Sequence, residues 1–159
     1  MEETAILAEL KRRFPQGVVD ASAPLGDATI VIRKDALLEI IPFLKEKPYE
    51  FAMLLDLTCV DYPERAERFE MVYHLFSLAA NRRLRIKLSV PENAAAVDSL
   101  VRFWKNADWL EREVFDMFGV RFAGHPDLRR LFMNDDFVGH PLRKDYPLRK
   151  RQPMIPLRK

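Results

Sequence analysis

Hydrophobic and polar residues alternate most regularly in the middle of the chain. Apolar side chains occupy every second position of residues 69–75, and again of residues 84–90. A period of two is that of a β-strand with one buried face, and the short segment at 79–83 suits a tight connection. The pattern predicts an antiparallel hairpin with strands at 69–78 and 84–90.

A period near 3.6 predicts two helices in the N-terminal part of the chain. Residues 3–14 form an amphipathic pattern that ends at a proline and a glycine. Residues 34–47 form a second one, in which Asp35 is placed as the N-cap and the ring of Pro42 should kink the helix.

Two further N-terminal segments carry weaker patterns. Short β-rich runs at 18–19 and 29–32 flank the turn-forming residues 24–27, which predicts a hairpin. Residues 51–62 are almost continuously apolar, and their type stays open, because the first half could be helical while the second half reads as extended.

Two more helices are predicted before the periodicity fades. The first covers residues 94–104, where apolar side chains recur at helical spacing. The second begins after an N-cap at Asn106 or Asp108 and runs to Phe118, where Gly119 should end it.

Composition divides the 159 residues into a compact domain at 1–120 and an irregular, proline-rich, basic arm at 121–159. A hydrophobic content of 48% with 31% charged residues is typical of a globular domain. The net charge of +2 hides an asymmetry, because residues 140–159 carry about +6 and the rest about −4. A basic arm without core-forming residues is expected to order on the surface of a partner.

Several classes of function lack their sequence signals. The single cysteine, Cys59, cannot form an internal disulfide or an iron-sulfur or zinc site from this chain's own thiolates. The glycines form neither a dinucleotide-binding nor a phosphate-binding loop. The N-terminus does not read as a signal peptide, and no run approaches the ~18 apolar residues of a membrane span, so a cytosolic or peripheral protein is expected. Nucleic-acid binding by the tail ranks below protein binding, since its prolines prevent a continuous helix.

The acids of residues 111–116 allow three interpretations. Arginines of the following segment could lock onto them, they could face solvent, or they could act as an acid–base pair. We favour the first, because no activated nucleophile accompanies them. Trp109, Glu113 and Asp116 share one helical stripe, so Glu113 and Asp116 are expected to face inward and to matter more than Glu111.

Two histidines, His125 and His140, each lie in a Gly-His-Pro tripeptide with aspartates between them. A His/carboxylate metal site is one hypothesis, and a small metal-dependent enzyme would follow from it. The simpler alternative is a rigid turn in which glycine supplies an unusual backbone angle and the imidazole bonds a nearby carbonyl.

Three segments together resemble the family of the thirty-kilodalton subunit, lettered C, of respiratory complex I, the proton-translocating NADH:quinone oxidoreductase. They are residues 111–120 (EREVFDMFGV), 124–131 (GHPDLRRL) and 139–147 (GHPLRKDYP). The signature and partner-interface residues that the resemblance implies are Glu111, Arg112, Glu113, Asp116, Gly119, Gly124, His125, Pro126, Arg129, Arg130, Gly139, His140, Pro141, Leu142, Arg143, Lys144, Asp145 and Tyr146.

The resemblance implies an α+β fold: a small mixed or antiparallel sheet with helices packed on one side, followed by an extended C-terminal arm. It implies a non-catalytic structural and assembly subunit of the peripheral arm of the complex, without cofactor, catalytic or metal-binding residues of its own. FMN, iron-sulfur clusters and quinone would belong to other subunits.

The implied partners are the hydrogenase-like subunit, lettered D, and the cluster-bearing subunit, lettered B. Membrane association would occur only through the complex, on the cytoplasmic side of the bacterial inner membrane. The same motifs also suit the equivalent subunit of a membrane-bound hydrogenase or another complex I relative.

Overall fold

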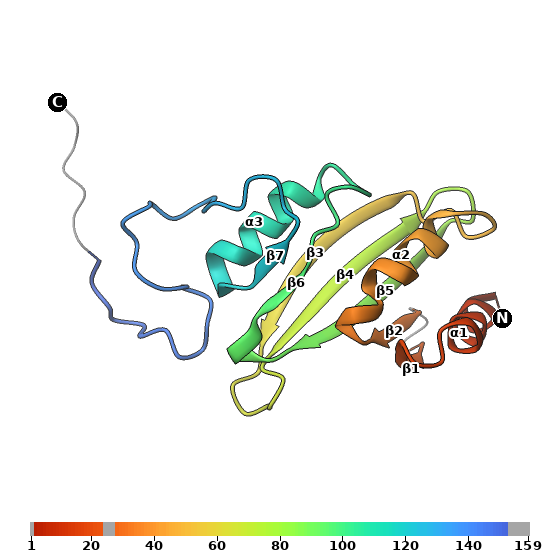
Figure 1. The fold of residues 1–159 in the computed structure, drawn as a ribbon, viewed down its shortest axis with the longest axis horizontal. Coiled ribbons are helices and arrows are strands. Elements are labelled where there is room, and N and C mark those ends of the chain that lie inside the picture. The colour runs from red at the N-terminus through yellow and green to blue at the C-terminus, as the bar shows by residue number, and fades with distance from the viewer. Residues whose placement is uncertain (1, 24–27, 153–159) are drawn as a thin grey trace.

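The computed structural model describes residues 2–23 and 28–152. Three helices, α1 (Glu2–Arg13), α2 (Leu37–Lys45) and α3 (Ala107–Phe118), accompany seven strands. The strands are β1 (Val18–Ser22), β2 (Thr29–Ile32), β3 (Met53–Asp61), β4 (Phe69–Ser77), β5 (Arg82–Val90), β6 (Ala96–Asp98) and β7 (Arg121–Ala123). Short 3-10 turns lie at Lys34–Ala36 and Glu92–Ala94. The fold is α+β, as the resemblance implied (Figure 1).

The main sheet has five strands in the order β1-β2-β5-β4-β3. Only the central β2–β5 pair is parallel, and the neighbouring pairs are antiparallel, so the sheet is mixed. β6 and β7 form a separate parallel pair. Both predicted hairpins are confirmed, β1–β2 and β4–β5, whereas the turn expected at 24–27 lies outside the described residues.

The core lies between one face of the sheet and the helices. Phe69, Met71, Tyr73 and Leu75 of β4 are all fully buried, as the alternation predicted. The apolar residues of α2 meet the same face, and Figure 1 shows α2 crossing in front of β4 and β5. One side of the five-stranded sheet therefore carries the core.

The open question at 51–62 is settled in favour of a strand, because β3 runs continuously from Met53 to Asp61. The helix expected at 34–47 begins as a 3-10 turn, passes through Pro42 and ends at Lys45. Asp35 does not cap it, since its carboxylate accepts hydrogen bonds from Arg33 instead.

The helix predicted at 94–104 is wrong. This segment contains β6 followed by turns, and Val97 pairs with Phe122 of β7. Tertiary partners replace the hydrogen bonds of a helix: the backbone N–H of Leu100 donates to the Glu111 carboxylate, and the carbonyl of Phe103 accepts from Lys45. Local periodicity cannot predict such bonds, because both partners are distant in sequence.

Strand β7 lies within the segment predicted to be an irregular arm. From residue 124 to residue 152 the chain contains no helix or strand, and we use "the arm" below for this stretch. Figure 1 shows it looping out from the end of the molecule where α3 and β7 lie. The functional question is what holds it there.

Candidate functional site

Helix α3 is buried on two sides. Ala107, Glu111 and Val114 face the sheet, while Arg112 and Asp116 form a second buried stripe. The predicted inward stripe is confirmed only for Asp116, which is fully buried, and it is wrong for Trp109, which is 60% exposed, and for Glu113, which is exposed too. The periodicity predicts one inner face for this helix, but the arm supplies a second surface against which it packs.

Asp116 is the main anchor of the arm. Its Oδ2 accepts the backbone N–H groups of Leu131, Phe132 and Met133 at 3.0, 2.7 and 2.8 Å. Its Oδ1 accepts from Nη1 of Arg130 at 2.7 Å. Burial alone would raise the pKa of Asp116, but these four donors outweigh it and hold the pKa below its usual value. The prediction that an arm arginine meets an acid of α3 is confirmed here.

Two arginines extend this contact along the arm. Arg112 donates from Nε to the carbonyl of Arg129 and from Nη2 to that of Arg130, each at 3.2 Å. Arg130 in turn donates from Nη2 to the carbonyl of Gly139 at 3.0 Å. One buried carboxylate and two guanidinium groups thereby fix the path of residues 129–139.

The second Gly-His-Pro turn covers the C-terminus of α3, whose last carbonyls have no partner within the helix. Nδ1 of His140 donates to the carbonyl of Asp116 at 3.0 Å, Leu142 N–H to that of Met117 at 3.1 Å, and Nε of Arg143 to that of Phe118 at 2.6 Å. Burial lowers the pKa of His140, and the nearby Arg143 and Arg130 act in the same direction.

Gly119 makes this close approach possible. Its φ of +80° confirms the predicted helix stop. A Cβ at this position would lie 2.6 Å from Nε2 of His140, so only glycine lets the imidazole pack over the helix end.

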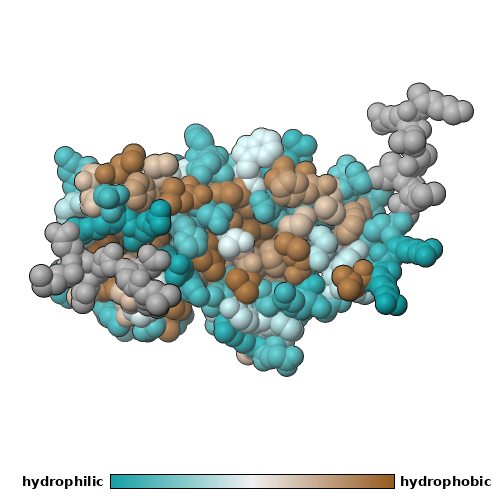
Figure 2. All heavy atoms as spheres, turned by 180° about the vertical axis from the view of Figure 1, so that it is seen from behind, coloured by the Kyte–Doolittle hydropathy of each residue, from teal (hydrophilic) through white to brown (hydrophobic). Residues whose placement is uncertain are grey.

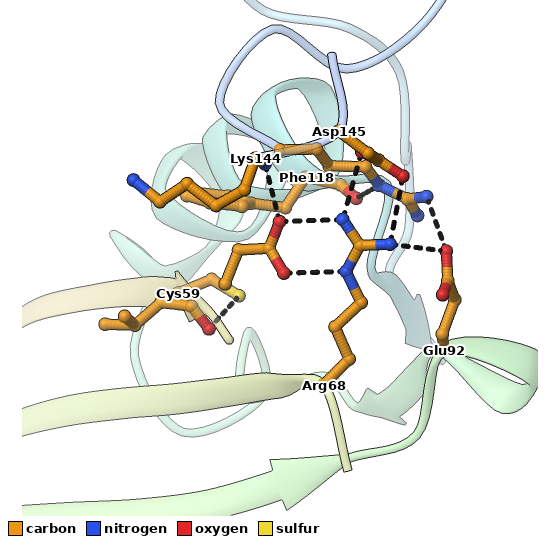
Figure 3. Close-up of polar contacts among 9 residues, drawn as sticks. Cys59, Arg68, Glu92, Phe118, Lys144 and Asp145 are labelled. Carbon is orange, nitrogen blue, oxygen red and sulfur yellow. Dashed lines mark hydrogen bonds and ion pairs between the residues drawn. The ribbon is translucent and has the colours of Figure 1, made fainter. Parts of the chain in front are cut away.

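Sequence reasoning missed a second anchor, between β3 and the arm (Figure 3). Arg68 makes a bidentate pair with Asp61, Nε–Oδ1 at 2.7 Å and Nη2–Oδ2 at 2.9 Å, and its Nη1 donates to Asp145 at 3.0 Å. The backbone N–H of Lys144 also donates to Asp61 at 2.7 Å, and Glu92 accepts from Arg68 at 2.9 Å. The Asp61 carboxylate is completely buried, and the hydrogen bonds from Arg68 lower its pKa despite the burial. The only local signal was an aspartate ending an apolar run.

The two predicted histidines do not form one site. Nδ1 of His125 accepts the N–H of Asp127 at 3.0 Å, which leaves Nε2 to donate to the carbonyl of Asp108 at 3.2 Å. His140 instead bonds the carbonyl of Asp116, eight positions or roughly 12 Å further along α3. Among residues 2–23 and 28–152, no three His, Cys, Asp or Glu side chains are grouped to hold a metal. The turn interpretation is confirmed for both.

Glu111 has a different environment from Asp116. It is fully buried, and its Oε1 accepts the Leu100 N–H at 2.6 Å. Its Oε2 lies 4.0 Å from Nε2 of His125 and, like the Tyr73 hydroxyl, has no hydrogen-bond partner in the described part of the chain. Burial, with a smaller effect of Asp108, raises the pKa of Glu111 to about 7.

The remaining signature residues shape the turns of the arm. Gly124 and Gly139 have φ of +81° and +108°. The ring of Tyr146 packs against Gly139 and stacks on Phe137 with 5.9 Å between centroids. The side chains of Pro126, Pro141, Arg129 and Lys144 are exposed or half-buried.

Cys59 is buried, and burial raises the pKa of its thiol to about 12, which suits a small core residue rather than a nucleophile. In the described ranges, every helix is too short or too polar to span a membrane.

Comparison with known proteins gives a consistent picture. The family model described as "Respiratory-chain NADH dehydrogenase, 30 Kd subunit" matches residues 30–152. The chain is 42% identical over 147 residues to the NADH-quinone oxidoreductase subunit lettered C of Citrifermentans bemidjiense, covering 92% of this chain and 91% of the relative. It is 49% identical over 133 residues to the protein of the same name from Caulobacter vibrioides, covering 83% and 67%.

Two solved structures share the fold. One is the trypsin-resistant fragment (1–134) of Nqo5, with a TM-score of 0.70, 30% identity, and coverage of 80% of this chain and all of the fragment. The other belongs to the membrane-bound sulfane sulfur reductase, an archaeal respiratory membrane complex, with a TM-score of 0.79 at 22% identity and coverage of 93% and 87%. The second likeness shows the fold alone.

Proposed function

Because this chain belongs to the 30 Kd subunit family of the respiratory-chain NADH dehydrogenase, we propose that it is a structural and assembly subunit of the peripheral arm of a proton-translocating NADH:quinone oxidoreductase. It serves electron transfer from NADH to quinone as part of that complex. The single observation that carries its structural role is the anchored arm, because the buried charged side chains Asp61, Arg68, Arg112 and Asp116 all hold the arm.

The isolated chain is proposed to have no activity and to bind no FMN, iron-sulfur cluster or quinone, which belong to other subunits. The side chains of Asp116 and His140 are committed to backbone partners, and the one thiol is buried. A purified chain that retained stoichiometric flavin or cluster would contradict this part of the proposal.

The arm is proposed to dock on the hydrogenase-like subunit, beside the cluster-bearing subunit. Its inner side is polar and anchored, whereas its exposed large apolar side chains are free for a partner. These are Phe132, Val138, Leu142 and Leu148, which are 52% to 98% exposed. Apolar side chains held at such exposure on a fixed backbone suit a protein interface. Membrane attachment, on the cytoplasmic side of the bacterial inner membrane, then comes only through the complex.

Truncation tests the docking proposal. A chain ending at Asp136 keeps the Asp116 contacts with residues 130–133 and loses Lys144 and Asp145. It should stay folded by circular dichroism and fail to co-purify with the hydrogenase-like subunit. Co-purification of the folded, truncated chain at the wild-type level would contradict docking through the arm.

Point variants test the exposed side of the arm without changing its anchored side. Leu142→Gln with Leu148→Gln changes only exposed side chains, and should weaken co-purification without changing the melting temperature. Val19→Gln, an equally exposed apolar residue on β1, is the matched control. Equal recovery of the wild type, the double variant and the control would place the docking contact elsewhere.

The alternative, an equivalent subunit of a membrane-bound hydrogenase or other complex I relative, has the same fold in its favour. NADH-dependent quinone reduction by the purified complex decides between them. Activity with NADH supports the proposed assignment, and a complex that uses another donor supports the alternative.

A further inference from the structure

None of the three described helices covers the second face of the main sheet. Strand residues alternate between the two faces, so the residues of β4 between its buried positions point away from the core. They are Glu70, Val72, His74 and Phe76. Figure 2 views the molecule from this side and shows hydrophobic residues running across its middle, with hydrophilic residues along the edges.

Apolar residues gather at one end of this face. Met53 of the edge strand β3 is directly opposite Phe76 of β4, and Leu55 follows on the same strand. Leu78 lies two positions beyond Phe76. Met53, Leu55 and Leu78 are 40% to 67% exposed, although a solvent-facing side of an antiparallel sheet is normally polar. We use the name open-face patch for Met53, Leu55, Phe76 and Leu78.

A basic row runs beside the patch on β5. The register places Arg83 opposite Phe76, Arg85 opposite His74 and Lys87 opposite Val72. Lys87 is paired with Glu70 at 2.8 Å, whereas Arg83 at the patch end is exposed. The surface that fits here is therefore apolar, with a carboxylate at its edge to face Arg83.

The open-face patch is far from the arm. Arg68, directly before β4, contacts Asp145 of the arm, whereas Phe76 lies near the other end of the nine-residue strand. At about 3.3 Å per residue, roughly 25 Å separate the two ends. Figure 1 shows the arm at one end of the sheet and the β4–β5 turn at the other.

We propose that the open-face patch is a second docking surface, which takes an apolar, carboxylate-bordered surface of another protein subunit of the complex; this rests on the proposed function. The chain then bridges two contacts at opposite ends of its sheet. A protein fits better than a lipid bilayer, because Met53 and Leu55 are more than half covered by their neighbours, and Leu78 alone of the patch is more than half exposed.

The test uses the assembled complex. Met53→Gln with Leu55→Gln changes exposed apolar side chains, and Arg83→Glu reverses the neighbouring charge. Each variant should be recovered with the complex about tenfold less than wild type, and the isolated variants should melt within ~2 °C of it. Val19→Gln, on the opposite edge strand β1, should assemble normally.

Every other outcome overturns the proposal. Wild-type recovery of both patch variants would show that no subunit docks there. A wild-type chain that dimerises alone, while the patch variants stay monomeric, would make the patch a self-interface. Patch-dependent flotation with anionic vesicles would assign it to the membrane. Arm truncation leaves the patch intact, so failure at the arm and failure at the patch are distinguishable.

Discussion

At the scale of single residues, two buried carboxylates on α3 have opposite environments. Asp116 receives four hydrogen bonds at its carboxylate, and they keep its pKa low. Glu111 leaves one oxygen without a hydrogen-bond partner among the described residues, and burial raises its pKa to about 7. The environment of Asp116 stabilises its charged form, and the environment of Glu111 stabilises its protonated form.

Glu111 should therefore make stability fall as the pH rises. Its pKa is higher in the folded protein than the 4.5 of a free side chain, so its contribution is complete below pH ~4.5 and is lost as the pH passes 7. Glu111→Gln keeps an acceptor for the Leu100 N–H and removes this loss. Relative to wild type, the variant should gain up to ~3 kcal/mol in free energy of unfolding between pH 5 and pH 8.5. Urea unfolding measures both proteins, and a constant difference across that range would contradict the assignment.

Asp116 and Glu113 should differ sharply, against the ranking expected from the sequence. Asp116→Asn removes the charge that pairs with Arg130 and should cost about 3 kcal/mol, since it leaves a half-buried cation without its partner. Glu113→Gln changes an exposed side chain and should stay within ~0.5 kcal/mol of wild type. Urea unfolding at pH 7 compares them, and similar losses in the two variants would contradict the different environments of Asp116 and Glu113.

At the scale of elements, α3 and its glycine stop are predictable from the sequence, because periodicity and capping act within a few residues. So are β4 and β5. The contacts of α3 with the arm are only partly predictable: the acids and arginines are visible, but which acid faces which arginine depends on the path of the arm. Arg68 meets Asp145 across 77 residues and Asp61 meets Lys144 across 83, and no local pattern indicates these contacts.

Alanine variants of Gly119 and Gly124 separate the stability cost of backbone strain from that of packing. Both have φ near +80°, but a Cβ at Gly119 would meet the His140 ring, whereas nothing lies within 4 Å of one at Gly124. Both alanine variants suffer the strain of a left-handed residue, about 1 to 2 kcal/mol. Gly119→Ala should cost at least ~1 kcal/mol more in thermal or urea unfolding, because the imidazole must move. Equal losses would show that His140 does not need this close approach.

At the scale of the whole molecule, the two anchors make the arm part of the fold. Asp61→Asn weakens the second anchor at both Arg68 and Lys144. Trypsin should then cleave after Arg143 or Lys144 about tenfold faster, because local opening becomes easier, while the body keeps its circular dichroism. Asp127→Asn, which alters only an exposed pair with Arg129, is the control. Unchanged cleavage of the Asp61 variant would argue against this anchor.

The sequence predicts an arm that orders on its partner, but the structure shows it anchored to its own domain. Amide hydrogen exchange of Leu131, Phe132 and Met133 in the isolated protein tests this most directly. These three N–H groups donate to Asp116, so they should exchange at least about tenfold more slowly than in an unfolded chain, and lose that protection in Asp116→Asn. Exchange of the wild-type amides at unfolded-chain rates would contradict the central claim that the arm is anchored before any partner binds.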